Sequence, residues 1–145
     1  MDQFEFFEYY PENTTYVCPP EDSNVHSGTL YRYSTEKGAV CARDFQLAIE
    51  SEIFVQRNRD NLVILCQGGG LSSFVDRESA KESLVQLRKN VPGMKNKFKG
   101  IHQIEISETD GVLKETPSQN SKNHYTWWSN KGIDYLNRAV FVEAF

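Results

Sequence analysis

The sequence predicts an α+β fold. Three short stretches, residues 29–34, 101–107 and 124–128, are rich in the β-branched and aromatic residues that favour strands. One longer stretch, residues 77–89, has apolar residues at helical spacing. Strands and helices alternate irregularly, without the regular repeat of a parallel α/β protein. With 145 residues, of which 39% are hydrophobic and 25% charged, the chain has the size and composition of one globular domain.

Residues 1–28 are expected to form an N-terminal arm ahead of a domain at 29–145. Pro11, Pro19 and Pro20 interrupt regular structure here. The aromatic residues of the arm make it too apolar for a free tail, so it either packs on the domain or docks against a partner. These residues are Phe4, Phe6, Phe7, Tyr9 and Tyr10.

The first half of the domain is predicted to contain two strands and one short helix. From Gly28 the residues alternate, with Leu30, Arg32 and Ser34 on one face of a strand. A turn follows at 36–38, and the mixed apolar spacing of 42–57 suggests a short helix. The continuous apolar run 62–66 has the β-branched content of a buried strand.

The second half begins with a glycine loop at 67–70 and the helix at 77–89, for which Asp76 is a suitable N-cap. Residues 101–107 alternate as a strand, Asp110-Gly111 signals a turn, and 114–123 form a polar loop. After the aromatic strand at 124–128, we expect a C-terminal helix from 133 to 145, with a last strand as the alternative for its end.

Charge and cysteine content narrow the functional classes. The net charge of −4 and pI near 5.4 argue against a general binder of phosphate backbones. The basic segment Arg88–Lys99 is therefore interpreted as a solvated loop rather than a nucleic-acid contact. Cys18, Cys41 and Cys66 have no metal-type spacing, so no metal site is expected and the thiols are expected to be reduced, with Cys66 buried and inert.

The sequence also predicts where the protein resides. The acidic, aromatic start lacks the basic and apolar regions of a secretory signal, and no apolar run is long enough for a membrane span. We therefore expect a cytoplasmic protein in the producing cell that contacts no membrane. If it is delivered to a target cell, it travels without a cleaved signal peptide.

Three places put a polar residue where it can do chemistry. Arg32 lies in a strand between two tyrosines, where it either meets an anion or lies at a sheet edge with its stem over Tyr33. The run from Gly68 to Phe74 either offers backbone amides and the Ser72 and Ser73 hydroxyls to a ligand, or is a flexible turn. It matches neither a Walker loop nor a nucleophile elbow.

The third place is His124-Tyr125-Thr126, at the start of the aromatic strand. An imidazole and a hydroxyl two residues apart share one face of a strand and can hydrogen-bond a sugar or an amide. The alternative is a core histidine bonded to backbone. Glu105, Glu108 and Glu115 are candidate acids, but none has a motif around it, so each is interpreted as a solvated surface carboxylate.

Together these motifs resemble a family of type VI secretion exported toxins with an ADP-ribosyltransferase-like fold, each paired with an immunity protein. The similarity lies in Thr29-Leu30-Tyr31-Arg32, in Gly69–Phe74 and in His124-Tyr125-Thr126, in that order. The chain departs from the family pattern at Leu71, where a small hydroxyl residue is expected, and no proline follows Thr126. The aromatic arm is extra.

The resemblance implies two small packed β-sheets with flanking helices around an NAD cleft. It also implies an NAD-dependent transferase or NAD-consuming effector acting in the target-cell cytoplasm on an unknown macromolecular acceptor, with nucleic acid disfavoured. Arg32 would contact the phosphates or hold the strand ends, Ser72 would orient the nicotinamide ribose, and His124 would hydrogen-bond a ribose. The implied NAD-binding residues are Tyr31, Arg32, Gly70, Ser72, Ser73, Phe74, His124, Tyr125 and Thr126.

Two other readings predict different structures. A non-catalytic effector or interaction module of a toxin–immunity system would use its aromatic arm, with the arm ordered only on a partner and the three motifs apart. A nucleotide- or RNA-binding domain would use Arg88–Lys99 with Trp127 or Trp128 for stacking. An NAD-dependent enzyme instead requires Arg32, Ser72 and His124 to line a single cleft.

Overall fold

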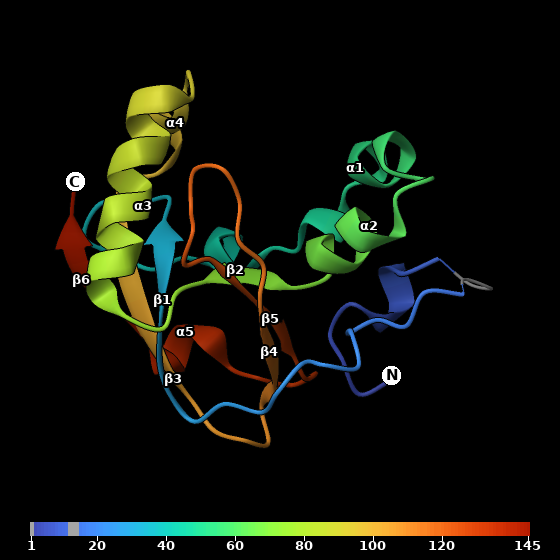
Figure 1. Cartoon of the computed structure of the whole chain (residues 1–145). Coiled ribbons are helices and arrows are strands. Elements are labelled where there is room, and N and C mark those ends of the chain that lie inside the picture. The colour runs from blue at the N-terminus through green and yellow to red at the C-terminus, as the bar shows by residue number, and fades with distance from the viewer. Residues whose placement is uncertain (1, 12–14) are drawn as a thin grey trace.

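The computed structural model describes residues 2–11 and 15–145, and within them the fold is α+β with two antiparallel three-stranded sheets. The first sheet has the order β1 (Gly28–Ser34), β3 (Gly100–Ile106), β6 (Ala139–Ala144). The second has the order β2 (Leu71–Ser73), β5 (Tyr125–Ser129), β4 (Gly111–Glu115). Figure 1 shows both sheets within one body.

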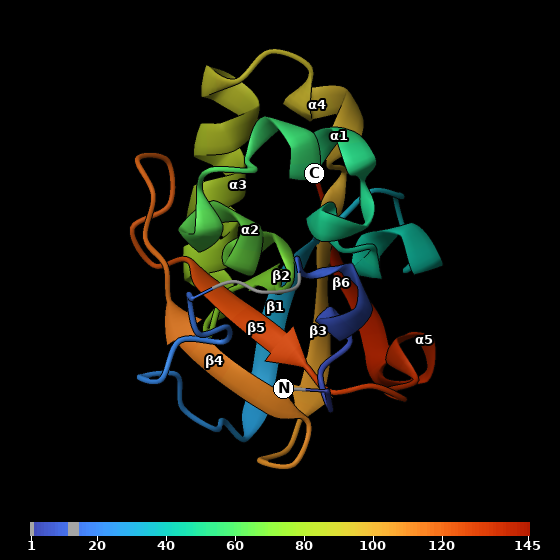
Figure 2. The ribbon, with the colours of Figure 1, turned by 90° about the vertical axis from the view of Figure 1, so that its right-hand side faces the viewer.

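The two sheets meet where β1 runs past the end of β2. Tyr31 N donates to Phe74 O at 2.8 Å, and Phe74 N donates back to Tyr31 O at 2.9 Å. Seen from the side, β4 and β5 cross obliquely in front of β1 and β3 (Figure 2). This junction brings β1 and β2, which are far apart in sequence, to one place in the fold.

Helices lie on both sides of the sheets. On one side are α3 (Arg77–Asn90) and α4 (Met94–Lys97), and on the other are α1 (Glu52–Arg57) and α2 (Leu62–Gly68) (Figure 1). The remaining helical turns are short and are η1 (Phe7–Tyr9), η2 (Ala42–Phe45), η3 (Ala48–Glu50) and α5 (Tyr135–Arg138).

Several predicted elements are confirmed. The alternating stretches at 29–34 and 101–107 are β1 and β3, and the aromatic stretch is β5, which begins one residue after His124. The predicted helix at 77–89 is α3, and the Asp76 carboxylate accepts a hydrogen bond from Ser79 N at 2.7 Å. A cap, an amphipathic pattern and a proline beyond the end are sufficient to specify this helix.

The prediction of a buried strand at residues 62–66 is wrong, because this run forms α2. Asn61 caps the helix by accepting a hydrogen bond from Ile64 N at 3.2 Å. Leu65 and Cys66 are buried, whereas Val63 is 45% exposed, so only one face of the run contacts the core. A short apolar run does not distinguish a strand from a helix by periodicity, and here tertiary packing overrides the β-branched preference.

The C-terminal helix expected at 133–145 forms over only part of its length, and the alternative of a last strand for its end is confirmed. Only Tyr135–Arg138 is helical, with Asp134 accepting from Asn137 N at 3.3 Å, and the chain then extends into β6. Val140, Phe141 and Val142 have the β preference that this strand uses to pair with β3. The short helix predicted within 42–57 is present as α1, and the residues before it form the 3-10 helices η2 and η3.

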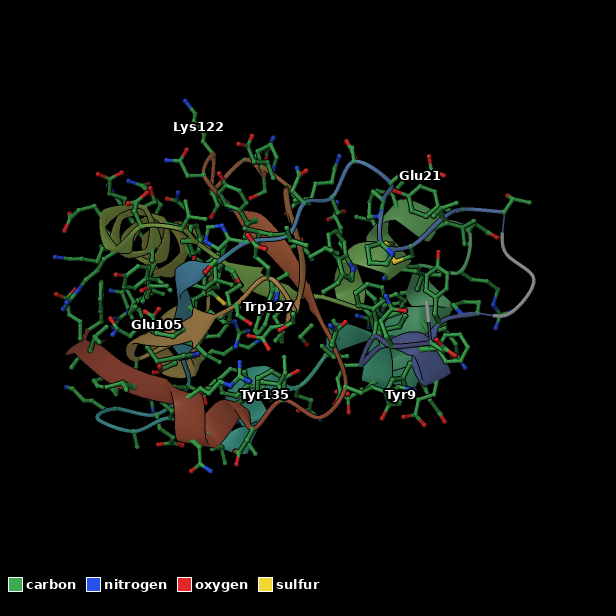
Figure 3. All side chains as sticks on the ribbon, turned by 90° about the horizontal axis from the view of Figure 1, so that it is seen from below. Tyr9, Glu21, Glu105, Lys122, Trp127 and Tyr135 are labelled. Atoms are coloured by element: carbon green, nitrogen blue, oxygen red, sulfur yellow. A yellow bond between two sulfur atoms is a disulfide. The ribbon has the colours of Figure 1, made fainter. Side chains whose placement is uncertain are left out.

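The expectation of three reduced thiols is contradicted, because Cys18 and Cys66 form a disulfide. The bond joins the N-terminal arm to α2 and is drawn in yellow in Figure 3. Cys41 is the free cysteine of the described residues. The pairing links positions 48 residues apart in sequence, so their spacing gives no local signal of it.

The N-terminal arm packs into the main core. Phe4, Phe6 and Tyr10 are buried in the same apolar cluster as Trp127 and Trp128 of β5. Phe7 and Tyr9 stay about two-fifths exposed, and Figure 3 shows Tyr9 at the periphery. None of the helices in the described part of the chain is long and apolar enough to cross a bilayer.

Candidate functional site

A cavity of about 1060 Å³ lies where β1 and β2 meet. Its wall includes η2, the stretch 46–51, residues 96–99 after α3, and the loop before β5. Arg32, Ser72 and His124 all line it, so the three residues that the sequence singles out converge on one cavity. Its volume is at the upper end of the range typical for small-molecule and cofactor sites.

Arg32 is buried and holds two other segments of the cavity wall. Its Nε donates to Ser72 O at 2.8 Å and its Nη1 donates to Asp44 O at 2.6 Å. The guanidinium carbon lies 5.0 Å from the centre of the Phe45 ring. These hydrogen bonds tie β2 and η2 to β1. Nη2 makes no hydrogen bond to a described residue.

Burial lowers the pKa of Arg32 to about 10, while the negative charge of Asp44 acts in the opposite direction. The guanidinium is therefore still cationic at neutral pH. A buried cation that is only partly compensated attracts an anion strongly, because the low local dielectric strengthens the interaction. This makes the floor of the cavity a favourable place for a phosphate or carboxylate.

The Asp44 carboxylate holds together the 35–41 turn and η2, which form part of the cavity wall. Its carboxylate accepts from Thr35 N at 2.9 Å, Thr35 Oγ1 at 2.7 Å and Cys41 N at 3.0 Å. Burial raises the pKa of Asp44, but these hydrogen bonds outweigh burial and the net pKa is lowered. Because the carboxylate is fully engaged, Asp44 serves to hold η2 and the 35–41 turn in place.

Glycine is required at residues 68–70 because neighbouring side chains pack closely against the backbone there. A Cβ on Gly68 would lie 2.4 Å from the Phe54 ring, one on Gly69 2.8 Å from Phe6, and one on Gly70 2.3 Å from Thr126 Cγ2. None of the three has a positive φ. The amides of Gly69 and Gly70 donate to Cys66 O and Gln67 O, so they are not free to cradle an anion as the sequence suggested.

Ser72 and Ser73 point to opposite faces of β2. Ser72 is exposed at the cavity, and its hydroxyl has no partner among the described residues. Ser73 is buried and donates to Leu71 O at 3.1 Å. Of the two hydroxyls considered from the sequence, Ser72 is therefore the one available to a ligand.

His124 has a defined tautomer. Its Nδ1 lies 2.9 Å from both Thr116 O and Thr116 Oγ1, and because a carbonyl can only accept, Nδ1 carries the proton. Burial lowers the pKa of His124, the hydrogen bond to Thr116 O opposes this, and the Arg32 charge adds to the lowering. The net pKa is lowered, so the ring is neutral at pH 7. Nε2 is then the basic nitrogen, and it makes no hydrogen bond to a described residue.

The loop that carries His124 is held by a chain of hydroxyl groups. Tyr33 OH, Ser83 Oγ and Ser121 Oγ form consecutive hydrogen bonds from β1 through α3 to this loop. Ser83 and Ser121 are buried, and burial raises the pKa of Tyr33, so the chain is a neutral network. Lys122, next to Ser121, points outward at the edge of the molecule in Figure 3.

Most of the other residues expected to bind NAD do not line the cavity. Tyr31 and Phe74 join the sheets through their backbones, and Tyr125 lies at a separate pocket beside β4. Thr126 is buried, with its hydroxyl 2.8 Å from Thr116 Oγ1. These residues support the site from behind, and Gly70 is the remaining predicted residue that lines it.

The acidic candidates also lie elsewhere. Glu105 bonds Thr29 on the exposed surface, Glu108 is in the exposed turn after β3, and Glu115 accepts from Tyr125 OH at 3.2 Å. The carboxylates in the cavity wall are Glu36, Asp44 and Glu50. Glu36 pairs with Arg43 at 2.8 Å, whereas Glu50 forms no ion pair within the described residues and accepts from Leu47 N at 2.7 Å.

A second histidine lies behind the cavity wall. His102 is fully buried on β3 opposite Arg32, and its Nδ1 is 2.8 Å from Ser34 Oγ. Burial, together with the Arg32 charge, lowers its pKa to about 3. Neither this histidine nor Glu50 has a sequence motif around it, so only the pairing of β1 with β3 and the path of 46–51 reveal them.

Comparison with known proteins identifies no relative: no protein-family model, curated protein or solved structure matches the chain. Among residues 2–11 and 15–145, no cluster of three or more histidine, cysteine or acidic side chains could hold a metal ion. The side chains that line the cavity supply a buried guanidinium, a free hydroxyl, a neutral imidazole and a carboxylate.

Proposed function

We propose that the protein binds NAD in this cavity and cleaves its nicotinamide glycosidic bond, as an ADP-ribosyltransferase-like toxin. The observation that carries the proposal is the convergence of Arg32, Ser72 and His124, from three separate parts of the chain, on one cavity. Two small sheets joined at the β1–β2 junction, with helices on both sides, agree with the split architecture that the resemblance implies.

The cavity suits a dinucleotide in its charge distribution. Arg32, Lys97 and Lys99 line the cavity without an ion pair to a described carboxylate and provide cations for a diphosphate. The Ser72 hydroxyl and His124 Nε2 can each hydrogen-bond a ribose. Phosphate binding of this kind supplies orientation that is remote from the reacting bond.

The proposed reaction breaks the bond between nicotinamide and its ribose. Nicotinamide leaves with the electron pair of that bond, and the ribose carbon passes through an oxocarbenium-like state. An oxygen or nitrogen of an acceptor, or of water, forms the new bond and loses its proton to solvent. Glu50 is the carboxylate best suited to stabilise the positive charge, because Arg43 already neutralises Glu36.

The arm-based alternative has less support. It requires an arm that is ordered only on a partner, whereas Phe4, Phe6 and Tyr10 are buried in the main core. The toxin role, the immunity protein and action in a target-cell cytoplasm are carried by the sequence resemblance. The Cys18–Cys66 disulfide adds that such a toxin would pass through an oxidising compartment, where disulfides form.

The test is NAD binding by calorimetry together with nicotinamide release by chromatography. We compare wild type with His124→Asn, whose amide can still donate to Thr116 O but has no equivalent of Nε2. We expect roughly 10-fold slower nicotinamide release with an unchanged melting temperature, since the variant loses the hydrogen bond from Nε2 to a ribose, worth about 1 kcal/mol. His26→Asn is the control, because His26 lies outside this cavity.

Wild type that neither binds NAD nor releases nicotinamide would refute the proposed function. The same holds if His124→Asn retains full activity. Glu50→Gln refines the assignment, because we expect it to slow release while leaving the affinity for NAD within about threefold.

A further inference from the structure

The segment Arg88–Lys99 concentrates positive charge beside the cavity. It contains five cations and no carboxylate, and it runs from the last turn of α3 through α4 to the start of β3. Lys97 and Lys99 line the cavity itself. We call its five cationic residues the basic rim; they are Arg88, Lys89, Lys95, Lys97 and Lys99.

The charges of the basic rim are not neutralised within the protein. None of the five forms an ion pair with a carboxylate of residues 2–11 or 15–145. By contrast, Arg77 and Lys81, near the start of α3, both pair with Glu143. Lys89, Lys95 and Lys97 are exposed, so their charge faces solvent.

Positive and negative charge are concentrated on different sides of the molecule, which the net charge of the chain does not reveal. Acidic residues Asp2, Glu5 and Glu8 belong to the N-terminal arm, which lies on the opposite side of the molecule from α4 (Figure 1). The net charge of −4 therefore does not describe the field at the mouth of the cavity. A local cationic stripe can bind a polyanion even on an acidic protein.

Two aromatic side chains lie between the basic rim and the cavity. Tyr33 and Phe98 both line the cavity, with their ring centres 5.1 Å apart, and Lys97 Nζ lies 5.1 Å from the centre of the Phe98 ring. Cations that follow a backbone, interleaved with rings on which bases stack, are the usual features of single-strand nucleic-acid binding.

We propose that the basic rim docks a single-stranded nucleic acid, with the phosphates along α4 and a base directed past Phe98 into the cavity. This reverses the interpretation of Arg88–Lys99 as a solvated loop, because the sequence does not reveal that the segment borders the cavity. The docking itself requires no NAD chemistry. That the strand is also the acceptor in the transfer rests on the proposed function.

The experiment measures anisotropy of fluorescein-labelled RNA and DNA strands of about 12 nucleotides, the scale of single-strand binding sites. Lys95→Gln/Lys97→Gln/Lys99→Gln is compared with a control, Arg57→Gln/Arg59→Gln/Lys131→Gln. Each triple variant removes three charges and changes the net charge from −4 to −7 (−4 − 3). The control residues are exposed and lie outside the cavity wall.

We expect wild type and control to bind both strands more tightly than the corresponding duplex. The rim variant is expected to bind at least about 10-fold more weakly. The slope of log binding constant against log salt concentration should become shallower by about 2, because the variant removes three phosphate contacts. Equal weakening of both triple variants would show a bulk charge effect and overturn the proposal, as would preference for the duplex.

NAD calorimetry on the same variants separates this proposal from the proposed function. If wild type binds no strand and the rim variant loses NAD affinity, the lysines serve the phosphates of the dinucleotide. That result overturns nucleic-acid docking and leaves the NAD site standing. If strands bind as expected but NAD does not, docking stands and the proposed function fails.

Discussion

The Arg32 guanidinium connects β1, β2 and η2 even when no ligand is bound. Its hydrogen bonds to Ser72 O and Asp44 O fix β2 and η2 against β1, and the same side chain lines the cavity. Loss of Arg32 therefore affects stability as well as binding. An activity measurement on an Arg32 variant alone does not separate the two effects, which is why His124 is the better functional probe.

Arg32→Met is expected to lower the free energy of unfolding by about 2–4 kcal/mol, because two carbonyl oxygens lose their donors. Urea denaturation measures this. Arg43→Met is the control, since its ion pair with Glu36 is exposed and worth less than about 1 kcal/mol. Equal losses in the two variants would contradict the role of Arg32 as a structural connection.

His102 predicts a specific pH dependence of stability. Its folded pKa of about 3, lowered by burial and by Arg32 and opposed by Asp44, lies below that of an unfolded histidine. The unfolded chain therefore binds more protons between these values, so stability is complete above about pH 6.5 and falls by about 1.4 kcal/mol per pH unit as the solution becomes more acidic. His124, whose pKa is also lowered, adds to this loss.

The check is urea unfolding of wild type and His102→Asn between about pH 6 and 4.5, above the range where most carboxyl groups titrate. We expect a clearly shallower decline for the variant, because one of the two neutral buried histidines is gone. Parallel curves for the two proteins would mean that His102 is not held neutral.

Residue types drew attention to three of the residues that line the cavity. Arg32 and His124 attract attention because a cation and an imidazole stand in strand-like sequence, and Ser72 because it follows glycines. The sequence could not show that Ser72 rather than Ser73 faces the cavity, since that depends on the register of β2 against β5. Glu50 lies in a broken run of turns whose path only the packed fold defines.

At the scale of elements, the disulfide fastens the arm to α2. Cys18 belongs to a segment with little regular structure, and Cys66 to a short helix that contacts the core on one face. Short helices are marginal alone, so both segments depend on tertiary contacts and on this bond. The arm and α2 are thus expected to unfold together when the bond is lost.

Cys18→Ala/Cys66→Ala should lower the free energy of unfolding by about 4 kcal/mol, the chain-entropy value for a loop closed over 48 residues. Cys41→Ala, at the free cysteine, is the matched control and should change stability by about 0.5 kcal/mol or less. Thermal unfolding with and without a reductant gives the same comparison in wild type. A double variant as stable as the control would contradict the role of the disulfide in fastening the arm to α2.

Elements with their own cap or residue pattern were predictable from the sequence. Elements whose secondary structure depends on packing or on pairing with another strand were not. The capped helix α3 and the alternating strand β3 follow from their own residues. The run 62–66 and the C-terminal segment have apolar residues that suit either class. Their structure is decided by the Asn61 cap and by pairing with β3, respectively. The glycines 68–70 reflect close packing, whereas their sequence suggested either a ligand-binding loop or a flexible turn.

At the scale of the whole molecule, two small sheets joined at one backbone bridge create a cavity between segments from most of the chain. The class α+β follows from the order of elements, but the cavity depends on which strand edges meet. Charge is also unevenly distributed, with the acidic arm on one side of the molecule and the basic rim on the other. The net charge does not reveal this separation. The order of elements thus predicts the fold class, whereas the topology decides which residues line the cavity.

The most direct test of the NAD site is a titration of NAD into isotope-labelled protein, followed by backbone amide NMR shifts. Binding in the cavity predicts the largest shifts at the residues that line it, in the stretches 32–36, 43–51, 70–72 and 118–124. His124→Asn should weaken these shifts, while amides of β4 and β6 stay unperturbed. Absence of any shift at millimolar NAD, or shifts centred away from Arg32, Ser72 and His124, would contradict an NAD site at the junction of the two sheets.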